Sequence, residues 1–359
     1  MRVFGLDFTS SPKKGKPLTL AKCKLNGQSL TVEGLHEFGN EAIKPLEDYA
    51  DWLSGAKYWE GEDEWIAGID LPFGMPLAAI ARFSWGEVSE NASWQDYVRE
   101  LFAKYTTLAD FEKAIKDWSY PNEISEAGNR IKIQSKRLTD QVAHAQSPMK
   151  VSDNPHVGKM FYRGCKAILD SSVVLPTLRP PADGRSKRVA IEAYPRLVAQ
   201  RFIPEQPAFD ELVATKRERI EARKKLDKSE AEQLANLKAE IRGLAAKAKL
   251  SRRYKEAGDN ELARNNRQSI VQSLSESSNP YGVQLCFEND ADKADCIADP
   301  KADKLDSVLC AVQAAWSFSL RDEGYGIPSF RDHSLLRQQI ALEGWIVDPA
   351  MLNVFGDSA

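Results

Sequence analysis

The chain has 359 residues, which is long enough to bury a substantial hydrophobic core without a partner. Its formal net charge of -3 excludes binding to nucleic acid through an overall positive charge, but leaves local basic patches open. The five cysteines are scattered without a CxxC pair, which argues against a zinc finger or a disulfide scaffold. No apolar run reaches the roughly 18 residues that span a bilayer, so the sequence predicts a cytoplasmic protein without a membrane partner.

The first 70 residues predict three antiparallel strands, a helix and a fourth strand. Apolar runs of strand length cover residues 2–8, 18–25, 28–35 and 65–69. Asn26 and Gly27 separate the second and third runs, and this dipeptide favours the positive φ angles of a tight hairpin turn. Apolar residues recur at helical spacing over about 41–53. Two prolines and a glycine follow Asp70, so the fourth strand must end there.

The rest of the chain alternates predicted strands with long helical stretches. Residues 77–181 predict several helices and a polar loop region, including a helix from Trp94 to Lys104 capped by Ser93. Further strands are predicted at 188–192 and 283–287, and an apolar helix at 302–320. Residues 209–275 lack proline and alternate charges at helical spacing, which predicts a helical arm suited to a protein partner or to self-association.

These elements divide the chain into a sheet domain and insertions. The predicted core comprises residues 1–76, 182–208 and 280–325, with an insertion at 77–181, the arm at 209–275 and a C-terminal extension at 326–359. The insertion is expected to place a loop over the functional site.

Acidic residues stand at the carboxyl ends of strands, where α/β sheets bind ligands. Asp7 ends the first strand, Asp70 the fourth and Glu192 the strand at 188–192. Asp303 and Asp306 share one face of the final helix, because they are three residues apart. For any one of these acids taken alone, the structural alternative is that it caps a helix, stabilises a turn or accepts a hydrogen bond.

Several unpaired carboxylates buried together are costly without a cation. Oxygen ligands without a thiolate or imidazole set favour Mg²⁺ or Mn²⁺. Two such ions can activate water and stabilise the leaving oxygen of a phosphodiester. The pattern of acids therefore indicates a divalent-metal site for phosphodiester hydrolysis.

Four segments together resemble the predicted RNase H-like nucleases gathered as uncharacterised domain family 429. These segments are residues 5–7 (GLD), 68–76 (GIDLPFGMP), 191–195 (IEAYP) and 303–311 (DKLDSVLCA). The resemblance extends from Asp7 to Ala315 and leaves the helical arm unexplained. It implies an α/β, RNase H-like fold with a mixed five-stranded sheet, made of an antiparallel meander plus parallel strands and flanked by helices, with helical insertions.

The resemblance also implies a metal-dependent nuclease that cleaves DNA or RNA. It implies that Asp7, Asp70 and Asp306 are catalytic metal ligands. The spacing of Asp303 from Asp306 is similar to that of the paired acids of resolvases, which implies a fourth ligand at Asp303. Glu192 has no counterpart among the resolvase ligands, so its expected catalytic role is open between metal ligation and another function.

Three basic groups are candidate nucleic-acid contacts, because cations release counterions condensed on the nucleic-acid backbone. They are Lys13, Lys14 and Lys16 after the first strand, Lys136 and Arg137 in the insertion, and Lys249, Arg252 and Arg253 in the arm. Arg137 belongs to a stretch that also resembles the family pattern, and its guanidinium is suited to bidentate binding of a phosphate. The alternatives are solvated charged surfaces and, for Arg137, a salt bridge with Asp140.

Two other functions compete with nuclease activity. An actin-like or sugar-kinase-like phosphotransferase shares such a sheet, and residues 9–13 imitate its phosphate-contacting hairpin, but the later half lacks the second glycine-rich phosphate turn. A binding module that has lost turnover is the other alternative, against which the retained acids argue. The sequence does not distinguish DNA from RNA.

Overall fold

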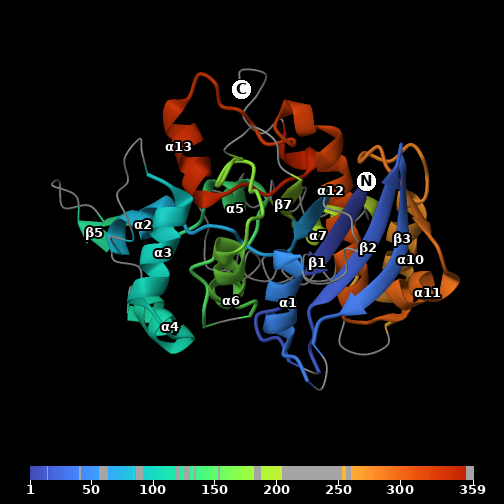
Figure 1. The fold of residues 1–359 in the computed structure, drawn as a ribbon, viewed down its shortest axis with the longest axis horizontal. Helices are drawn as coiled ribbons and strands as arrows, with labels where there is room; N and C mark the ends of the chain where they lie inside the picture. Colours follow the sequence, from blue (N-terminus) through green and yellow to red (C-terminus); the bar gives the residue numbers. More distant parts are fainter. Residues whose placement is uncertain are drawn as a thin grey trace, which may run out of the picture.

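The computed structural model has an α/β architecture in which one mixed sheet is flanked by helices (Figure 1). It describes residues 1–13, 15–39, 42–55, 64–83, 85, 92–117, 122–124, 130–132, 135–152, 154–181, 187–203, 253–255 and 260–352. Among these residues, no helix combines the length and hydropathy needed to cross a membrane.

The main sheet has six strands, which correspond to the six runs predicted as strands, whereas the resemblance implied a sheet of five. In spatial order they are β7 (Arg188–Glu192), β4 (Trp65–Ile69), β1 (Arg2–Asp7), β2 (Thr19–Asn26), β3 (Ser29–Glu37) and β8 (Gln284–Phe287). β1 pairs in parallel with β4 and antiparallel with β2, and β4 pairs in parallel with β7. The sixth strand arises because β8 pairs in parallel with β3 at the far edge.

The hairpin predicted between β2 and β3 is confirmed. Gly27 has a φ of 57°, which glycine adopts without steric cost, and Asn26 pairs with Ser29 across the turn. The next helix, α1 (Pro45–Ser54), begins later than the expected residue 41. Proline favours this start, because its fixed φ suits the first turn of a helix.

One face of the sheet is covered by α1 and by helices of the predicted insertion. Of the insertion helices, α6 (Val157–Asp170) packs beside α1, α3 (Trp94–Lys104) and α4 (Leu108–Asp117) pack on α6, and α2 (Leu77–Phe83) contacts α13 (Ser334–Glu343). As predicted, the Ser93 hydroxyl caps α3 by accepting a hydrogen bond from the Asp96 N–H. Phe4 and Leu6 of β1 point into this layer, where they share a core with Trp52.

The other face is covered by the long helix α12 (Asp303–Ser319). Beside it are α7 (Pro195–Phe202), α10 (Glu261–Leu274) and α11 (Asp290–Ala298), of which α10 and α11 lie at the right of Figure 1. Side chains of α10 such as Ile270 and Leu274 are fully buried in the core of this layer. α10 is helical, as predicted for this part of the arm, but it packs into the domain instead of projecting from it. Residues 209–252 and 256–259 of the predicted arm lie outside the described residues.

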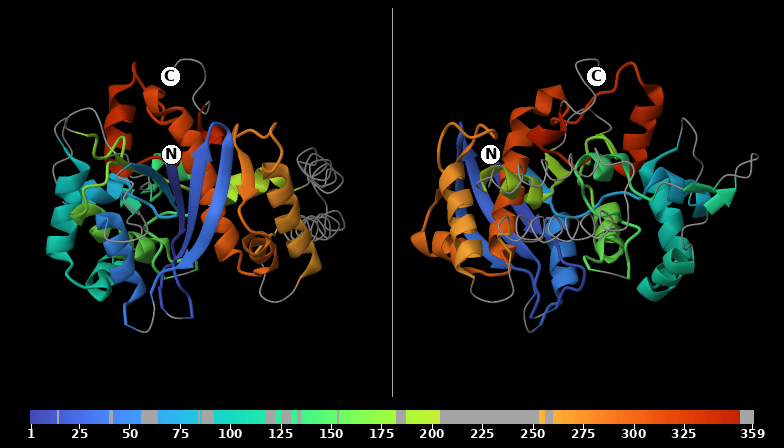
Figure 2. Two further views of the ribbon diagram at one scale, coloured as in Figure 1. Left: turned by 45° about the vertical axis from the view of Figure 1, so that its right-hand side comes forward. Right: turned by 180° about the vertical axis from the view of Figure 1, so that it is seen from behind.

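The C-terminal stretch, drawn in red at the top of both views in Figure 2, packs against the end of β7, where Ile346 pairs with Glu192. Its helical segments are η1 (Arg321–Glu323), α13 (Ser334–Glu343) and η2 (Pro349–Met351). The Val347 N–H donates to the Glu192 carbonyl at 2.9 Å. A third small core joins this stretch to α5 (Leu138–Val142), while β5 (Asn122–Ile124) and β6 (Arg130–Lys132) form a separate hairpin in the insertion. Described residues 326–352 thus form part of the packed domain rather than an appendage.

Two paired glycines let α12 lie directly on the sheet backbone. Gly5 of β1 and Gly68 of β4 are partners in the parallel register. A Cβ added at Gly5 would come within 1.9 Å of the Ser307 carbonyl oxygen, and one at Gly68 within 2.2 Å of the Cys310 carbonyl oxygen. The absence of a side chain at both positions therefore sets how close the first turns of α12 come to β1 and β4.

Substituting Gly68 with alanine is expected to lower the free energy of unfolding by about 1–3 kcal/mol, because the helix backbone must move to admit the methyl group. Urea denaturation measures this change. Gly15→Ala is the matched control, since a Cβ at Gly15 meets nothing within 4 Å. Equal stability of the two variants would contradict the close packing of α12.

Candidate metal centre

Three carboxylates from distant parts of the chain converge beside these glycines. One oxygen from each of Asp7, Asp70 and Asp306 lies within 4.8 Å of the others. Asp7 ends β1, Asp70 directly follows β4, and the Asp70 N–H donates to the Leu6 carbonyl at 2.9 Å. Asp306 lies in the first turn of α12, one turn before the helix crosses Gly68. The predicted convergence of these three acids is confirmed.

Burial and mutual repulsion both disfavour the charged form of these acids. Burial raises the pKa of Asp7 well above its usual range, and Asp306 and Asp70 add to this rise, while Lys255 opposes it. Burial, reinforced by Asp306, raises the pKa of Asp70 to about 7. Burial also raises the pKa of Asp306, against the opposing charge of Lys255. The cluster is thus an environment that a cation would stabilise.

Two residues that the sequence did not identify complete this centre. The Tyr254 hydroxyl donates to Asp306 Oδ1 at 3.0 Å, and the Lys255 ammonium forms an ion pair with Asp306 Oδ2. Both residues directly follow Arg252 and Arg253, which were predicted only as nucleic-acid contacts. This basic sequence was the one available signal, and it gave no reason to pair Lys255 with Asp306.

Asp303 lies near this cluster but outside the set of three converging carboxylates. It is half-buried in the first turn of α12. Burial raises its pKa, while the positive charges of Lys255, Lys301 and Lys16 lower it. Its expected role as a fourth ligand stays a prediction.

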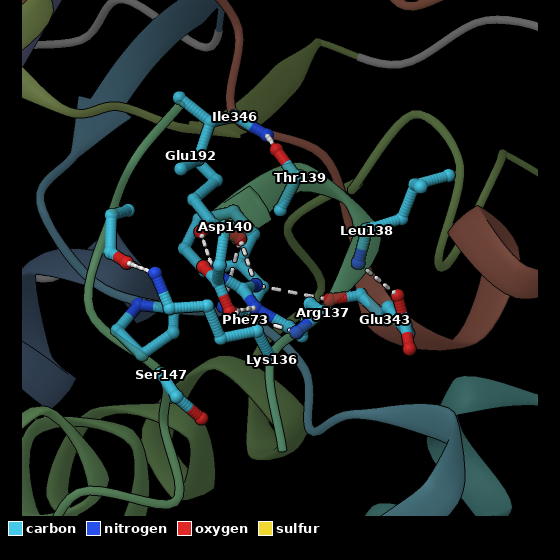
Figure 3. Close-up of polar contacts among 12 residues, drawn as sticks. Phe73, Lys136, Arg137, Leu138, Thr139, Asp140, Ser147, Glu192, Glu343 and Ile346 are labelled. Carbon is cyan, nitrogen blue, oxygen red and sulfur yellow. Dashed lines mark hydrogen bonds and ion pairs between the residues drawn. The ribbon is translucent and has the colours of Figure 1, made fainter. Parts of the chain in front are cut away.

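Glu192 forms an ion pair with Arg137 (Figure 3) and lies outside the set of three converging carboxylates. Arg137 Nη2 donates to Glu192 Oε1 at 2.6 Å, and Nη1 donates to Oε2 at 2.8 Å. The same guanidinium binds Asp140 through Nη2 at 2.7 Å and Nε at 3.1 Å. Burial raises the pKa of Glu192, and Arg137 opposes this rise.

This network contradicts the interpretation of Arg137 as an open phosphate contact. Arg137 is only 1 % exposed, and its guanidinium also donates to the Glu343 carbonyl at 3.0 Å. The structure instead contains the alternative salt bridge with Asp140, extended by Glu192. The reason is burial, because a guanidinium between two carboxylates in the protein interior does not face a ligand in solvent.

The network joins the insertion to the sheet and to the C-terminal stretch. Glu192 Oε2 accepts a hydrogen bond from the Phe73 N–H at 3.1 Å, just beyond Asp70. The Glu343 carboxylate accepts from the backbone N–H groups of Leu77 and Leu138, at 2.6 and 2.7 Å. Arg137 and Glu192 thereby support the loop that carries Asp70.

The remaining basic candidates are distributed unevenly around the centre. Lys13 and Lys16 are exposed and pair through their backbones in the turn after β1. Lys16 lies close enough to Asp303 to lower its pKa. The Lys136 ammonium donates to the Ala145 carbonyl at 2.8 Å, within its own loop. Arg253 is exposed, whereas Lys14, Lys249 and Arg252 lie outside the described residues.

Comparisons of the chain with protein-family models, with curated proteins and with solved structures found no match. The resemblance to uncharacterised domain family 429 therefore stays a prediction.

The residues present fit a hard divalent cation. Asp306 Oδ2 is buried and is contacted by an ammonium group, so this position already accommodates a positive charge. The converging ligand atoms are all carboxylate oxygens, which Mg²⁺ and Mn²⁺ prefer over softer donor sets. Asp7, Asp70 and Asp306 would hold the ion.

The raised pKa of Asp70 predicts a pH dependence of stability in metal-free protein. In the folded state the pKa is about 7, whereas an unfolded aspartate has a pKa of about 3.9. Between these values the folded state binds more protons, so the free energy of unfolding falls as pH rises from about 4 to about 7. Thermal unfolding in EDTA is expected to show a steeper decline for wild type than for Asp70→Asn. Parallel profiles for the two proteins would contradict this assignment.

Proposed function

We propose that the protein is a metal-dependent nuclease that hydrolyses phosphodiester bonds of nucleic acid. The observation that carries this proposal is the convergence of Asp7, Asp70 and Asp306 at the carboxyl ends of β1 and β4 and the start of α12. Two buried carboxylates and one partly exposed carboxylate at one edge of an α/β sheet form a site for a hard cation.

The sheet topology supports an RNase H-like fold. β1, β2 and β3 form an antiparallel meander, and β4 and β7 extend the sheet in parallel on the other side of β1. The resemblance implied this combination of meander and parallel strands, with the acids on the first strand, the fourth strand and the last helix. β8 is an addition at the outer edge.

Each residue of the site has a definable task. Asp7, Asp70 and Asp306 hold the cation, and Gly5 and Gly68 bring α12 close enough for Asp306 to join the other two. A divalent cation bound there supplies Lewis-acid stabilisation of the phosphodiester and acidifies an attacking water. Lys13 and Lys16 are exposed, Lys16 lies close to Asp303, and both are suited to contact the phosphate backbone.

A nucleic-acid binding module without turnover is the second candidate. The Lys255 ammonium paired with Asp306 favours it, because a cluster neutralised from within does not require a metal. The two candidates differ in whether a bound substrate is cut.

The test is incubation of purified protein with labelled single-stranded, duplex, hybrid and branched nucleic acids in Mg²⁺, Mn²⁺ or EDTA. We expect cleavage of at least one substrate with a divalent ion and none in EDTA. Binding without cleavage under all conditions would support the binding module. Cleavage that persists in EDTA would contradict the metal-dependent mechanism.

A further inference from the structure

Lys255 enters the acidic cluster from a different part of the chain than its three carboxylates. Its ammonium forms an ion pair with Asp306, which is fully buried, while the Lys255 side chain is 44 % exposed. It also acts on the other two acids, since its charge opposes the rise in the pKa of Asp7 and of Asp70. A single ammonium therefore partly neutralises the site proposed to hold a divalent ion.

The segment that carries Lys255 is fixed by buried polar groups of α10. The Asn266 Nδ2 group donates to the Arg253 carbonyl at 2.8 Å, and Arg267 Nη1 donates to the Tyr254 carbonyl at 2.8 Å. Both donors come from side chains that are at most 5 % exposed. Tyr254 is itself buried and donates to Asp306. These contacts position Lys255 beside the three carboxylates.

The anchors act on residues 253 and 254, so the Lys255 side chain can leave without unfolding the segment. Lysine has a flexible four-carbon stem and a strongly hydrated ammonium, which solvent accepts readily. Tyr254 donates its hydrogen bond to Asp306 Oδ1, whereas Lys255 pairs with Oδ2. When Lys255 leaves, Oδ2 is therefore the atom that a replacement cation would bind.

We propose that Lys255 is a built-in counter-cation that a divalent metal must displace, so that the ammonium and the metal compete for Asp306. This inference rests on the proposed metal site. It predicts that the apo protein is stabilised by Lys255 and that the metal affinity of the wild type is weakened by it. Under this competition, the apparent Mn²⁺ affinity equals the intrinsic affinity multiplied by the fraction of molecules in which Lys255 has left Asp306.

The test is Mn²⁺ binding to metal-free Lys255→Met, measured by isothermal titration calorimetry without substrate. If Lys255 occupies the site in about nine molecules out of ten, the dissociation constant for Mn²⁺ falls roughly tenfold in the variant. In EDTA the variant is expected to melt at a lower temperature than wild type. Added Mn²⁺ should raise its melting temperature more than that of wild type.

Two further variants test whether the charge of residue 255 is responsible for the change in Mn²⁺ affinity. Lys255→Arg retains the charge and is expected to bind Mn²⁺ close to the wild-type affinity. Lys304→Met is the matched control, because Lys304 forms an ion pair with Asp295, outside the three converging carboxylates, and its loss should leave Mn²⁺ affinity unchanged.

The outcomes separate this inference from the proposed function. An unchanged or weaker Mn²⁺ affinity in Lys255→Met, with binding still dependent on Asp306, overturns the competition alone. Tighter binding in Lys255→Met by a protein that cuts no nucleic acid supports the competition and contradicts the nuclease. Absence of Mn²⁺ binding in both wild type and Lys255→Met overturns both.

Discussion

Replacing Asp306 with asparagine is expected to reduce metal-dependent cleavage at least about 100-fold, since even residues that only support metal ligands cost about 10–100-fold. Asp306 is completely buried and is one of the three converging carboxylates. Asparagine keeps the shape of the side chain and an oxygen that can accept the Tyr254 hydrogen bond, but it removes a negative charge from the site. Cleavage of a labelled substrate under single-turnover conditions measures the effect.

Asp322→Asn is the matched control for Asp306→Asn. It makes the same chemical change at a side chain that is 88 % exposed in η1, outside the converging carboxylates. The control should cut at the wild-type rate and bind nucleic acid normally. Wild-type cleavage by Asp306→Asn, reproduced in a second preparation free of contaminating nuclease, would falsify the assignment of the site.

Replacing Arg137 with methionine is expected to lower the free energy of unfolding by about 3–5 kcal/mol, because breaking a buried ion pair leaves uncompensated charge in the interior. Here two carboxylates, Asp140 and Glu192, would lose their partner at once. Chemical denaturation measures the loss. Arg137→Lys should recover only part of it, since an ammonium cannot reproduce the paired hydrogen bonds of the guanidinium.

The comparison that isolates this effect is Arg99→Met, which removes an exposed arginine paired with Asp96 on α3. Exposed ion pairs contribute about 0–1 kcal/mol, so this variant should be nearly as stable as wild type. Adding Glu192→Gln to Arg137→Met should restore part of the lost stability by removing one orphaned charge. Equal stability of Arg137→Met and Arg99→Met would show that the ion pairs of Arg137 with Asp140 and Glu192 do not stabilise the fold.

Local sequence patterns were sufficient to locate most of the site. The strand ends at Asp7 and Asp70 follow from a short apolar run before each acid and, after Asp70, from prolines that cannot continue a sheet. Asp306 follows from its place on the first turn of an apolar helix. These features depend on residues that are close together in the sequence, so the sequence alone is sufficient to predict them.

Features that depend on distant pairing were not predictable in the same way. Lys255 and Asp306 are 51 positions apart, and Arg137 and Glu192 are 55 apart, so no spacing rule connects them. The charge alternation around α10 suggested an exposed arm because polar residues dominate its sequence. Its buried face consists of a few residues such as Ala263 and Ile270, whose partners come from other elements.

Anomalous diffraction from crystals grown with Mn²⁺ tests the metal centre most directly. We expect a manganese peak bounded by the carboxylates of Asp7, Asp70 and Asp306, with the Lys255 ammonium no longer paired with Asp306. A saturating Mn²⁺ concentration that leaves the three carboxylates without a peak and the Lys255 to Asp306 ion pair intact would contradict the metal site.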